Sequence, residues 1–349
     1  MNANSEEVMN ADVRNQPLAI PMKKVAFLDF WSSFNPDFFP LKDICDIQIT
    51  DMEHADYVFF SVHGDKHWKA PDRCIKIFYT LENLAPDFNS CDYAIGFEWL
   101  TCEDRYLRFP LFYLYKDICE LMEAKHLQPL EKVMAMKTDF CSITVSNSNR
   151  DPIFKILFDA LSCYKKVDSG GLWHNNVGGP VRDKLSFDSK HKFSIVCENT
   201  SHSGYTTEKL VQAFAANCIP IYWGDPSVNK VFNPKAFINV SDYASIDDLV
   251  TYIKKIDSDD KLYHQMLQEP ALIDEQYCKQ HQLDLLHQFL SNILTPPIES
   301  AYRRNRKMWG KIYVDNRRRQ SNGLLFILNK KYHSWVWKTK QFVRRYIRF

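Results

Sequence analysis

The stretch CENTSHSGYTTEKLVQAF, residues 197–214, contains the passage from a strand to a helix that decides the fold of this chain. An apolar strand ends at its start, a polar loop with Gly204 follows, and a helical pattern begins after Thr206, the predicted N-cap. Glu208 and Lys209 stand in the first turn of this helix. A lysine there opposes the helix dipole. It therefore predicts an anion that binds both the lysine and the free N–H groups of the helix start.

Strand-like and helix-like patterns alternate on both sides of this stretch. Short runs rich in β-branched and aromatic residues predict strands at 23–31, 44–49, 56–61, 75–80, 92–97, 140–146, 192–198, 219–223 and 236–240. Apolar periodicity predicts helices at 152–164, 206–217 and 246–256. Strands that alternate with helices favour parallel, doubly wound sheets.

The predicted organisation has four parts. At 349 residues the chain exceeds the size at which a single core keeps growing, and the charged, strand-poor segment around 120–139 separates two series of strands. We predict two Rossmann-like domains with a ligand cleft between them. The parts are a polar leader (1–22), an amino-terminal acceptor domain (23–130), a carboxy-terminal nucleotide-binding domain (131–300) and a basic aromatic tail (301–349).

The tail differs in charge from the rest of the chain. From residue 302 onward there are 15 lysines and arginines and one acid, whereas the remainder is acidic. In YHSWVWKTKQFVRRYIRF, residues 332–349, most apolar side chains share one helical face. Such a helix is typical of segments that bind an anionic membrane surface. A helix docked on the acidic body is the alternative, and nucleic-acid binding is not expected because no recognised module accompanies the charge.

The composition also bears on the compartment. No stretch approaches the roughly 20 apolar residues of a membrane span, and the start MNANSEEVMNADVRNQ lacks a secretory pattern. The ten cysteines show neither CxxC pairs nor a framework spacing, which predicts reduced thiols. We expect a cytoplasmic protein that is peripheral on the inner face of the cytoplasmic membrane.

The loop and first helical turn suit a nucleotide sugar. N–H groups of the helix start and the ammonium of Lys209 can hold a diphosphate. The carboxylate of Glu208 can accept hydrogen bonds from sugar hydroxyl groups. Taken alone, the pattern fits equally well a solvated helix start in which neither side chain binds a ligand.

Over longer stretches the sequence resembles one enzyme family. ENTSHSGYTTEKLVQAF with the following CIPIYWGDPSVNKVFNPKAFINV is similar to the signature region of the α-1,3-fucosyltransferases, in particular the bacterial Lewis-antigen-type members of glycosyltransferase family 10. IFYTLENLAPDFNSCDYAIGF, DRYLRFPLF and KKVDSGGLWHNNVGGPVRDKLSF extend the resemblance over most of residues 75–240. It implies two Rossmann-like domains in the GT-B arrangement and GDP-L-fucose as donor.

The resemblance also implies roles for individual residues. It assigns Asn199, Tyr205, Glu208 and Lys209 to the donor site: Lys209 would neutralise the diphosphate, Glu208 would bind hydroxyl groups of ribose or fucose, and the other two would shape the pocket. In the block YTLEN it makes Glu82 the candidate general base. An inverting transfer needs a carboxylate that takes the proton of the attacking hydroxyl, and fixed positive charge can stabilise the leaving diphosphate.

Two positions depart from the family pattern. An arginine that helps to hold phosphate in relatives falls, in an ungapped register, on Phe154. Arg150 and Lys155 are the neighbouring cations that could replace it. Cys197 stands where the family usually has phenylalanine, a change expected to affect packing only.

The sequence predicts no essential metal and no cofactor. The tripeptide Asp-Ser-Asp at 257–259 resembles the motif of metal-dependent transferases, but its charged surroundings after a helix favour a solvated turn. His63 and His67 lie in a loop-like segment without a third ligand. The resemblance implies a fold in which Lys209 and the helix dipole do the work of a metal.

Together these features predict an inverting transfer of L-fucose from GDP-L-fucose to the 3-hydroxyl of N-acetylglucosamine in Galβ1,4-GlcNAc-type acceptors. The product would be a Lewis x-like glycan or a surface polysaccharide such as lipopolysaccharide. One alternative keeps the fold with α-1,4 or another acceptor specificity. Another is a non-catalytic, membrane-tethered nucleotide-sugar binder, which Phe154 favours and the retained Glu82 disfavours.

Overall fold

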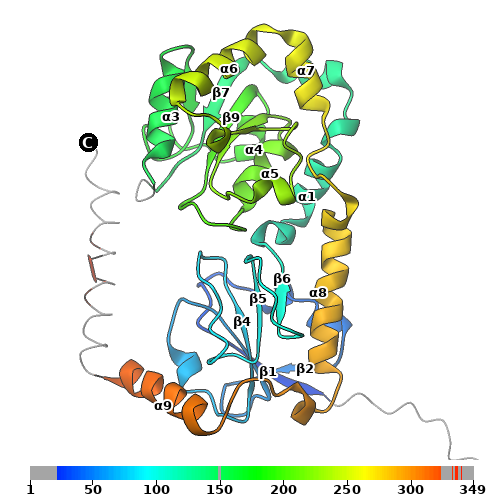
Figure 1. The fold of residues 1–349 in the computed structure, drawn as a ribbon, viewed down its shortest axis with the longest axis vertical. Helices are drawn as coiled ribbons and strands as arrows, with labels where there is room; N and C mark the ends of the chain where they lie inside the picture. The colour runs from blue at the N-terminus through cyan, green and yellow to red at the C-terminus, as the bar shows by residue number, and fades with distance from the viewer. Residues whose placement is uncertain (1–21, 148–150, 324–331, 333–334, 337–338, 340–349) are drawn as a thin grey trace, which may run out of the picture.

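The structure, a computed structural model, describes residues 22–147, 151–323, 332, 335–336 and 339. Two parallel β-sheets lie one above the other along the long axis of the molecule (Figure 1). The lower sheet belongs to the amino-terminal half and the upper sheet to the middle of the chain. The predicted α/β architecture with two parallel sheets is confirmed. The leader falls outside the described residues, apart from its last one.

The first sheet is parallel throughout, with strand order β2-β1-β3-β4-β5-β6. Alternate side chains point to opposite faces, so that β3 gives Tyr57 and Phe59 to a large apolar cluster and Val58 and Phe60 to a smaller one behind it. The strands are β1 (Lys23–Leu28), β2 (Ile47–Ile49), β3 (Tyr57–Phe60), β4 (Ile75–Tyr79), β5 (Tyr93–Gly96) and β6 (Tyr106–Arg108).

Short 3-10 helices, rather than α-helices, connect several strands of this first sheet. They span Pro36–Phe38, Leu41–Asp43 and Lys66–Trp68. Each of these helices contains or follows a proline or a polar turn residue. Because each is only three residues long, none can cover a face of the sheet by itself. Aromatic side chains from these loops take over part of that role, since the ring of Phe39 packs against that of Phe59 at a tilt of 39°, with 5.0 Å between ring centroids.

The second sheet is doubly wound, with strand order β11-β10-β9-β7-β8. Its strands are β7 (Asp139–Ile143), β8 (Val167–Ser169), β9 (His191–Cys197), β10 (Ile219–Trp223) and β11 (Ile238–Asn239). One face of this sheet packs on α3 (Ile153–Ser162), α6 (Ile246–Ser258) and α7 (Asp260–Gln268). Helix α5 (Glu208–Ala215) instead contributes to the large apolar cluster that contains Tyr57 and Phe59 of the first sheet. Two shorter helices, α2 (Leu130–Met136) and α4 (Lys184–Asp188), complete this half.

A continuous apolar cluster joins the two halves. Helix α1 (Lys116–Glu123) packs against α5, and the ring of Phe112 lies 5.5 Å from that of Phe232, which in turn stacks on Phe214 at 5.9 Å. These buried side chains belong to the same core as β1, β3 and β4. The spacing of the halves is therefore set by side-chain packing.

The chain returns to the first sheet after the second one is complete. Helix α8 (Lys279–Leu294) runs beside the first half in Figure 1, and its Leu286 and Leu290 are buried in the shared core. Phe289 packs edge-on against Tyr93 of β5 at 6.1 Å. The apolar face of α8 thus packs in the cluster that joins the two halves, and the limit of the second domain at residue 300 stays a prediction.

The first part of the predicted tail is docked on the amino-terminal half. The carboxylate of Asp92 is completely buried and accepts the backbone N–H groups of Arg303 and Arg304, each at 3.0 Å, and the guanidinium of Arg306 at 3.0 Å. Helix α9 (Met308–Asn322) follows. A buried carboxylate needs such partners, so the segment that leads into α9 is part of the packing of the first half. The boundary of the tail at 301 stays a prediction.

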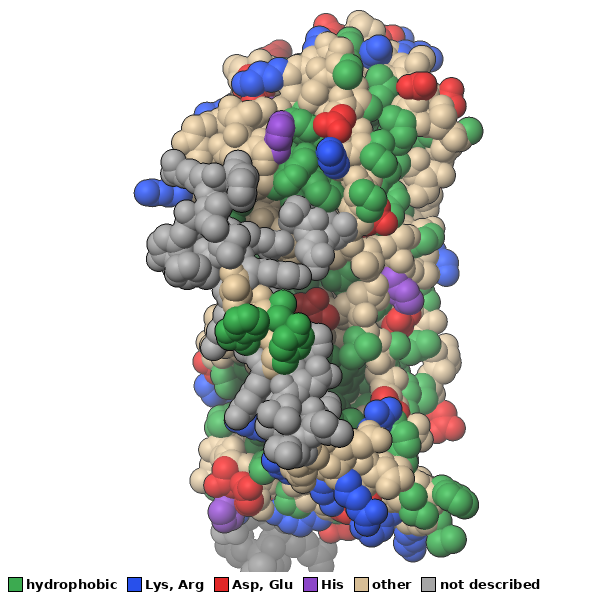
Figure 2. Space-filling model, turned by 90° about the vertical axis from the view of Figure 1, so that its left-hand side faces the viewer, with side chains coloured by type: hydrophobic (Ala, Val, Ile, Leu, Met, Phe, Trp, Pro, Cys, Tyr) green, Lys and Arg blue, Asp and Glu red, His purple; other side chains and the backbone are tan. Residues whose placement is uncertain are grey.

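The outer face of α9 remains open. Figure 2 shows lysine and arginine side chains gathered with hydrophobic ones at this end of the molecule. Met308 and Trp309 are 74% and 77% exposed. Most of the predicted amphipathic helix at 332–349 lies outside the described residues. Among the described residues, no helix is long and apolar enough to cross a membrane.

Candidate functional site

The candidate site lies where the strand order of the second sheet reverses. After β7 the chain moves to β8 on one side and then to β9 on the other. In open parallel sheets, ligands bind outside the carboxyl ends of the strands at this point. A hollow is present there, between the ends of β7 and β9. It is lined by Ile143, Thr144, Val145, Phe154, Lys184, Ile195, Val196, Cys197 and Lys209.

A buried carboxylate organises the start of α5. Glu198 directly follows β9, is completely buried, and accepts hydrogen bonds from the backbone N–H and the hydroxyl of Thr207, each at 2.7 Å. It also accepts the ammonium of Lys209 at 3.0 Å. Sequence reasoning missed Glu198; its place between an apolar strand and a polar loop was the available signal.

A second buried carboxylate holds the loop before α5. Asp225 accepts the N–H of Gly204 at 2.8 Å and the hydroxyl of Thr206 at 3.0 Å. The N-cap of α5 is Thr207 and not Thr206, and its side chain makes no capping hydrogen bond. The hydroxyl groups of both threonines donate to buried carboxylates instead, that of Thr206 to Asp225 and that of Thr207 to Glu198. Asp225 also accepts the N–H and hydroxyl of Ser227, at 2.7 and 2.6 Å. Four donors on one carboxylate make this loop a rigid frame.

The predicted donor residues occupy different environments. Lys209 lines the hollow, and Glu208 lies beside it in the first turn, with its Oε1 3.7 Å from the ammonium. Asn199 is exposed at the loop after β9. Tyr205 is buried, its ring edge-on to that of Phe97 from the other half at 5.0 Å. The structure thus gathers all four on one loop and helix start.

Gly204 fits a place where the two halves approach closely. Its φ is +86°, a backbone conformation that favours glycine. A Cβ at this position would lie 2.5 Å from the carbonyl oxygen of Phe97. The loop of the second half therefore touches the end of β5 through its backbone.

Glu82, the predicted base, lies in the loop after β4 and is exposed. Its N–H donates to the hydroxyl of Thr80 at 3.0 Å. The neighbouring Asn83 donates through Nδ2 to the hydroxyl of Thr200 at 2.7 Å, across the two halves. Because Thr200 follows Asn199, this bond brings the loop of Glu82 to the loop between β9 and α5 (198–207), called the donor loop below after the donor residues predicted in it.

Further polar contacts span the halves near the same loop. Glu98 pairs with His202 at 2.8 Å. The indole N–H of Trp99 donates to Ser227 at 2.8 Å, and the guanidinium of Arg108 lies 3.8 Å above the same indole ring. Burial lowers the pKa of Arg108. These contacts fix the donor loop relative to the first sheet.

The position of the missing family arginine is filled by an aromatic side chain. Phe154 is buried at the hollow and its ring lies edge-on to Trp173 at 4.8 Å. Lys155, one of the two predicted replacements, is exposed and does not line the hollow. Successive helical residues point about 100° apart, which explains why it faces elsewhere. Arg150, the other candidate, lies outside the described residues.

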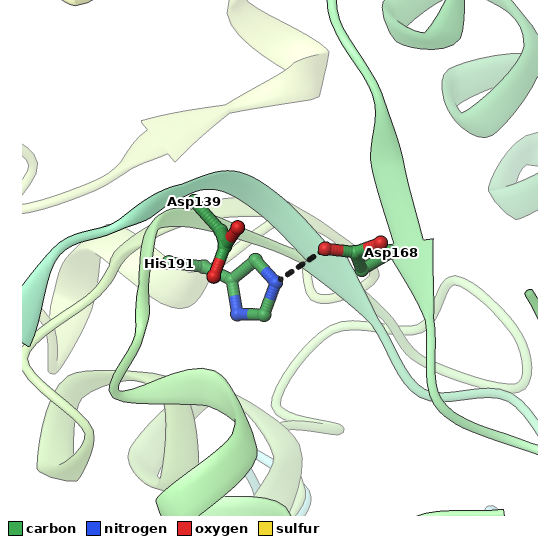
Figure 3. Close-up of side chains that lie close together, drawn as sticks. All are labelled: Asp139, Asp168 and His191. Carbon is green, nitrogen blue, oxygen red and sulfur yellow. Dashed lines mark hydrogen bonds and ion pairs between the residues drawn. The ribbon is translucent and has the colours of Figure 1, made fainter. Parts of the chain in front are cut away.

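One set of potential metal ligands lies at the opposite edge of the sheet. Asp139, Asp168 and His191 can each offer one ligand atom, all within 4.8 Å of one another (Figure 3). Asp168 is already paired with His191 at 3.2 Å and with Lys166 at 2.6 Å. Asp139 and His191 begin β7 and β9, so this cluster lies at the strand ends away from the hollow.

The Asp-Ser-Asp tripeptide is not a solvated turn. Asp257 is buried and pairs with Lys165 at 2.5 Å and Lys192 at 2.7 Å. Asp259 caps α7, accepting the N–H groups of Lys261 and Leu262. The expectation of a solvated turn was wrong for Asp257, because the two lysines come from other elements of the fold.

Family models match both halves of the chain. A model described as "Alpha-(1,3)-fucosyltransferase FucT N-terminal domain" covers residues 25–115. One described as "Glycosyltransferase family 10 (fucosyltransferase) C-term" covers residues 134–280. The two matches correspond to the two sheets.

Relatives agree with these matches. An alpha-(1,3)-fucosyltransferase FucT of Helicobacter pylori is 38% identical over 226 residues, covering 56% of this chain and 47% of that protein. A bovine 3-galactosyl-N-acetylglucosaminide 4-alpha-L-fucosyltransferase is 34% identical over 137 residues, 38% of this chain and 37% of the relative. The chain thus spans about half or less of the length of these curated relatives.

A crystal structure of an alpha1,3-fucosyltransferase with GDP-fucose is similar over 84% of this chain and 94% of its own, with a TM-score of 0.66 and 32% identity. A second structure of an alpha1,3-fucosyltransferase has a TM-score of 0.69 at 29% identity, over 87% of this chain and 96% of its own. The predicted GT-B arrangement of two Rossmann-like domains is confirmed. The chain belongs to glycosyltransferase family 10, the fucosyltransferases.

Proposed function

We propose that this chain transfers L-fucose from GDP-L-fucose to the 3-hydroxyl of N-acetylglucosamine in Galβ1,4-GlcNAc-type acceptors, with inversion at the anomeric carbon. The observation that carries the proposal is the joint position of two features. A lysine-lined hollow lies at the switch point of the second sheet, and the loop with Glu82 is hydrogen-bonded to its rim through Asn83 and Thr200. A relative of this fold is described with GDP-fucose.

The proposed chemistry divides between the two halves. The carboxylate of Glu82 takes the proton of the acceptor hydroxyl while that oxygen forms a bond to the anomeric carbon of fucose. The bond from this carbon to the diphosphate breaks on the opposite face, and GDP leaves. Lys209 and the N–H groups at the start of α5 stabilise the negative charge on the diphosphate. Glu198 and Thr207 hold Lys209 in position.

The acceptor is the less constrained part of the proposal. The relatives carry names that describe both 3- and 4-linked fucosylation, in the Helicobacter pylori and bovine proteins respectively. Product linkage by NMR after reaction with type 2 (Galβ1,4-GlcNAc) and type 1 (Galβ1,3-GlcNAc) disaccharides distinguishes the two. If a product formed only from the type 1 disaccharide, the proposed 3-linkage would be refuted in favour of a 4-linkage.

The first experiment measures GDP release from GDP-fucose with and without N-acetyllactosamine. We expect acceptor-dependent release by the unmodified chain, and a loss of roughly 100- to 10,000-fold in Glu82→Gln with donor affinity unchanged. Lys209→Ala should weaken donor binding as well as turnover. Glu53→Gln, an exposed acid of the same half, is the matched control and should react normally.

The outcomes separate enzyme from binder. Donor binding without turnover on any offered acceptor would favour a non-catalytic nucleotide-sugar binder, a possibility raised by Phe154. Full activity of Glu82→Gln would refute the role of Glu82. We further propose that no divalent metal is required, so that activity should persist in EDTA; its loss, with recovery on adding Mg²⁺ or Mn²⁺, would contradict this.

We also propose a cytoplasmic protein that binds the inner face of the cytoplasmic membrane. Support comes from the basic, aromatic sequence of residues 332–349 and from the exposed Trp309 on α9, next to Ile312, which is 47% exposed. Sedimentation with anionic and with uncharged liposomes tests this. We expect binding to anionic liposomes only and a loss of binding when the chain ends at residue 323; a chain that stays in the supernatant would refute it.

A further inference from the structure

The hollow at the switch point contains a cation that sequence reasoning did not select. Among the described residues that line it, the charged side chains are Lys184 and Lys209, both positive. They come from different elements, α4 and α5. The hydroxyl of Thr144, directly after β7, is buried, has no hydrogen-bond partner within the described part of the chain, and lines the same hollow. Two ammonium groups and one unused hydroxyl suit an anion with several oxygens.

The two lysines are held in the same way. Lys209 is 3.0 Å from the completely buried Glu198, and Lys184 is 2.5 Å from the completely buried Asp188. Asp188 also accepts the hydroxyl of Ser142 at 2.7 Å. An ammonium has three donors. In each lysine a donor directed at a buried carboxylate fixes the side chain. Lys209 gives a second donor to the hydroxyl of Thr207 at 2.8 Å, which leaves its third for a ligand.

The position of Lys184 complements that of Phe154. Both residues line the hollow, but Phe154 brings an aromatic ring and no charge from α3. Lys184 reaches the hollow from the start of α4, and its side chain is 26% exposed. The positive charge that α3 does not supply is thus present in the hollow from another direction.

We propose that Lys184 binds the diphosphate of the donor together with Lys209, and so supplies the charge that is missing at Phe154. This inference rests on the proposed function, because it takes a nucleoside diphosphate as the ligand. Lys209 lies in the first turn of α5 and Lys184 at the start of α4, and both line the hollow. A diphosphate in the hollow would meet both ammonium groups.

The test compares ligands that differ only in phosphate. Isothermal titration with GDP, GMP and guanosine is carried out on the full chain and on Lys184→Met. Loss of a charge-assisted contact should weaken GDP binding roughly 10- to 100-fold. Binding of GMP should fall less, and binding of guanosine should stay within about twofold. Lys190→Met, an exposed lysine two residues beyond α4, is the control and should bind all three normally.

Two further variants keep the test independent of folding. Lys184→Met leaves Asp188 buried without its cation, so the double variant Lys184→Met/Asp188→Asn removes both charges and should show the same selective loss. In the Lys184→Met background, Phe154→Arg should restore GDP affinity at least in part. A role that is merely structural would not be rescued by a cation from α3.

The possible failures are distinguishable. If the unmodified chain does not bind GDP, the proposed function fails first. If the unmodified chain binds GDP and both Lys184 variants bind it equally well, the inference is overturned while the proposed function stands. A parallel loss of affinity for guanosine would also overturn it, because guanosine has no phosphate to lose.

Discussion

Replacing Gly204 by alanine tests whether the two halves are held at one fixed spacing beside the donor loop. A Cβ at Gly204 would lie 2.5 Å from the carbonyl oxygen of Phe97 in the other half. Gly178 offers a matched control, because its φ of +88° is nearly that of Gly204, +86°, and a Cβ there meets no atom within 4 Å. Both alanines carry a backbone penalty of about 1 kcal/mol. The substitution at Gly204 adds the contact between the halves.

The added cost follows from the hydrogen bonds around the loop. A normal contact between carbon and oxygen is about 3.3 Å or more, so relief requires the backbones to separate by nearly 1 Å. This separation strains the bonds that cross between the halves beside the loop, from Trp99 to Ser227 and between His202 and Glu98, each 2.8 Å long. Such bonds contribute about 1 kcal/mol each, and more with a charged acceptor. We expect Gly204→Ala to lose about 2–4 kcal/mol of stability and Gly178→Ala about 1 kcal/mol.

Thermal unfolding followed by circular dichroism measures the difference. The halves share one apolar cluster, and for a cooperative unit of this size 1 kcal/mol corresponds to about 1.5 °C. The midpoint should fall by about 3–6 °C in Gly204→Ala and by about 1–2 °C in Gly178→Ala. Equal shifts in the two variants would refute the reasoning, because they would mean that the contact with Phe97 is relieved at no cost.

Three other carboxylates give separate predictions. Glu198→Gln should lower the free energy of unfolding by about 2–4 kcal/mol, because three donors lose a charged acceptor. Chemical denaturation measures the loss, with the exposed Glu131→Gln as control; equal stability of the two variants would contradict the prediction. Asp92→Asn should expose 301–323 to limited proteolysis, since the buried Arg304 and the half-buried Arg306 lose their counter-charge. An unchanged cleavage pattern would argue against docking. Burial acts to raise the pKa of Asp257, but hydrogen bonds from two lysines lower it below the ordinary 3.8. A lowered pKa of Asp257 stabilises the folded chain above pH 3.8. The difference in free energy of unfolding between the native chain and Asp257→Asn should therefore shrink as the pH falls below this value. A difference that stays constant between pH 7 and 3 would exclude a lowered pKa of Asp257.

Local pattern was sufficient for the passage from β9 to α5. A short apolar run, a polar loop with glycine and an amphipathic helix each depend on neighbouring residues, and their periodicities differ between strand and helix. For the same reason nine of the eleven strands in the described part of the chain were predicted near their observed places. The two that were missed, β6 and β8, are three residues long and too short for a periodicity to appear. The N-cap was misplaced by one residue, because neither threonine caps the helix with its hydroxyl: both hydroxyl groups donate to buried carboxylates, and one of these, Asp225, stands 19 positions after Thr206.

Helix α8 shows where local pattern was insufficient. Its moderately apolar sequence could cover either sheet, and only packing of Phe289 against Tyr93 places it with the first half. The docking of residues 301–323 was missed for a similar reason. Asp92 and Arg306 are separated by 214 positions, and no periodicity links residues so far apart.

The sequence by itself determined the alternation of strands and helices, the donor loop with Glu208 and Lys209, and the resemblance that singled out Glu82. These features are written in short segments whose residues act on their neighbours. The tertiary structure alone decided which charges meet. It buried Glu198 beneath Lys209, brought Lys184 to the same hollow from α4, and left Lys155 outside it. Burial and pairing depend on distant elements that close around a side chain, and only the complete fold supplies them.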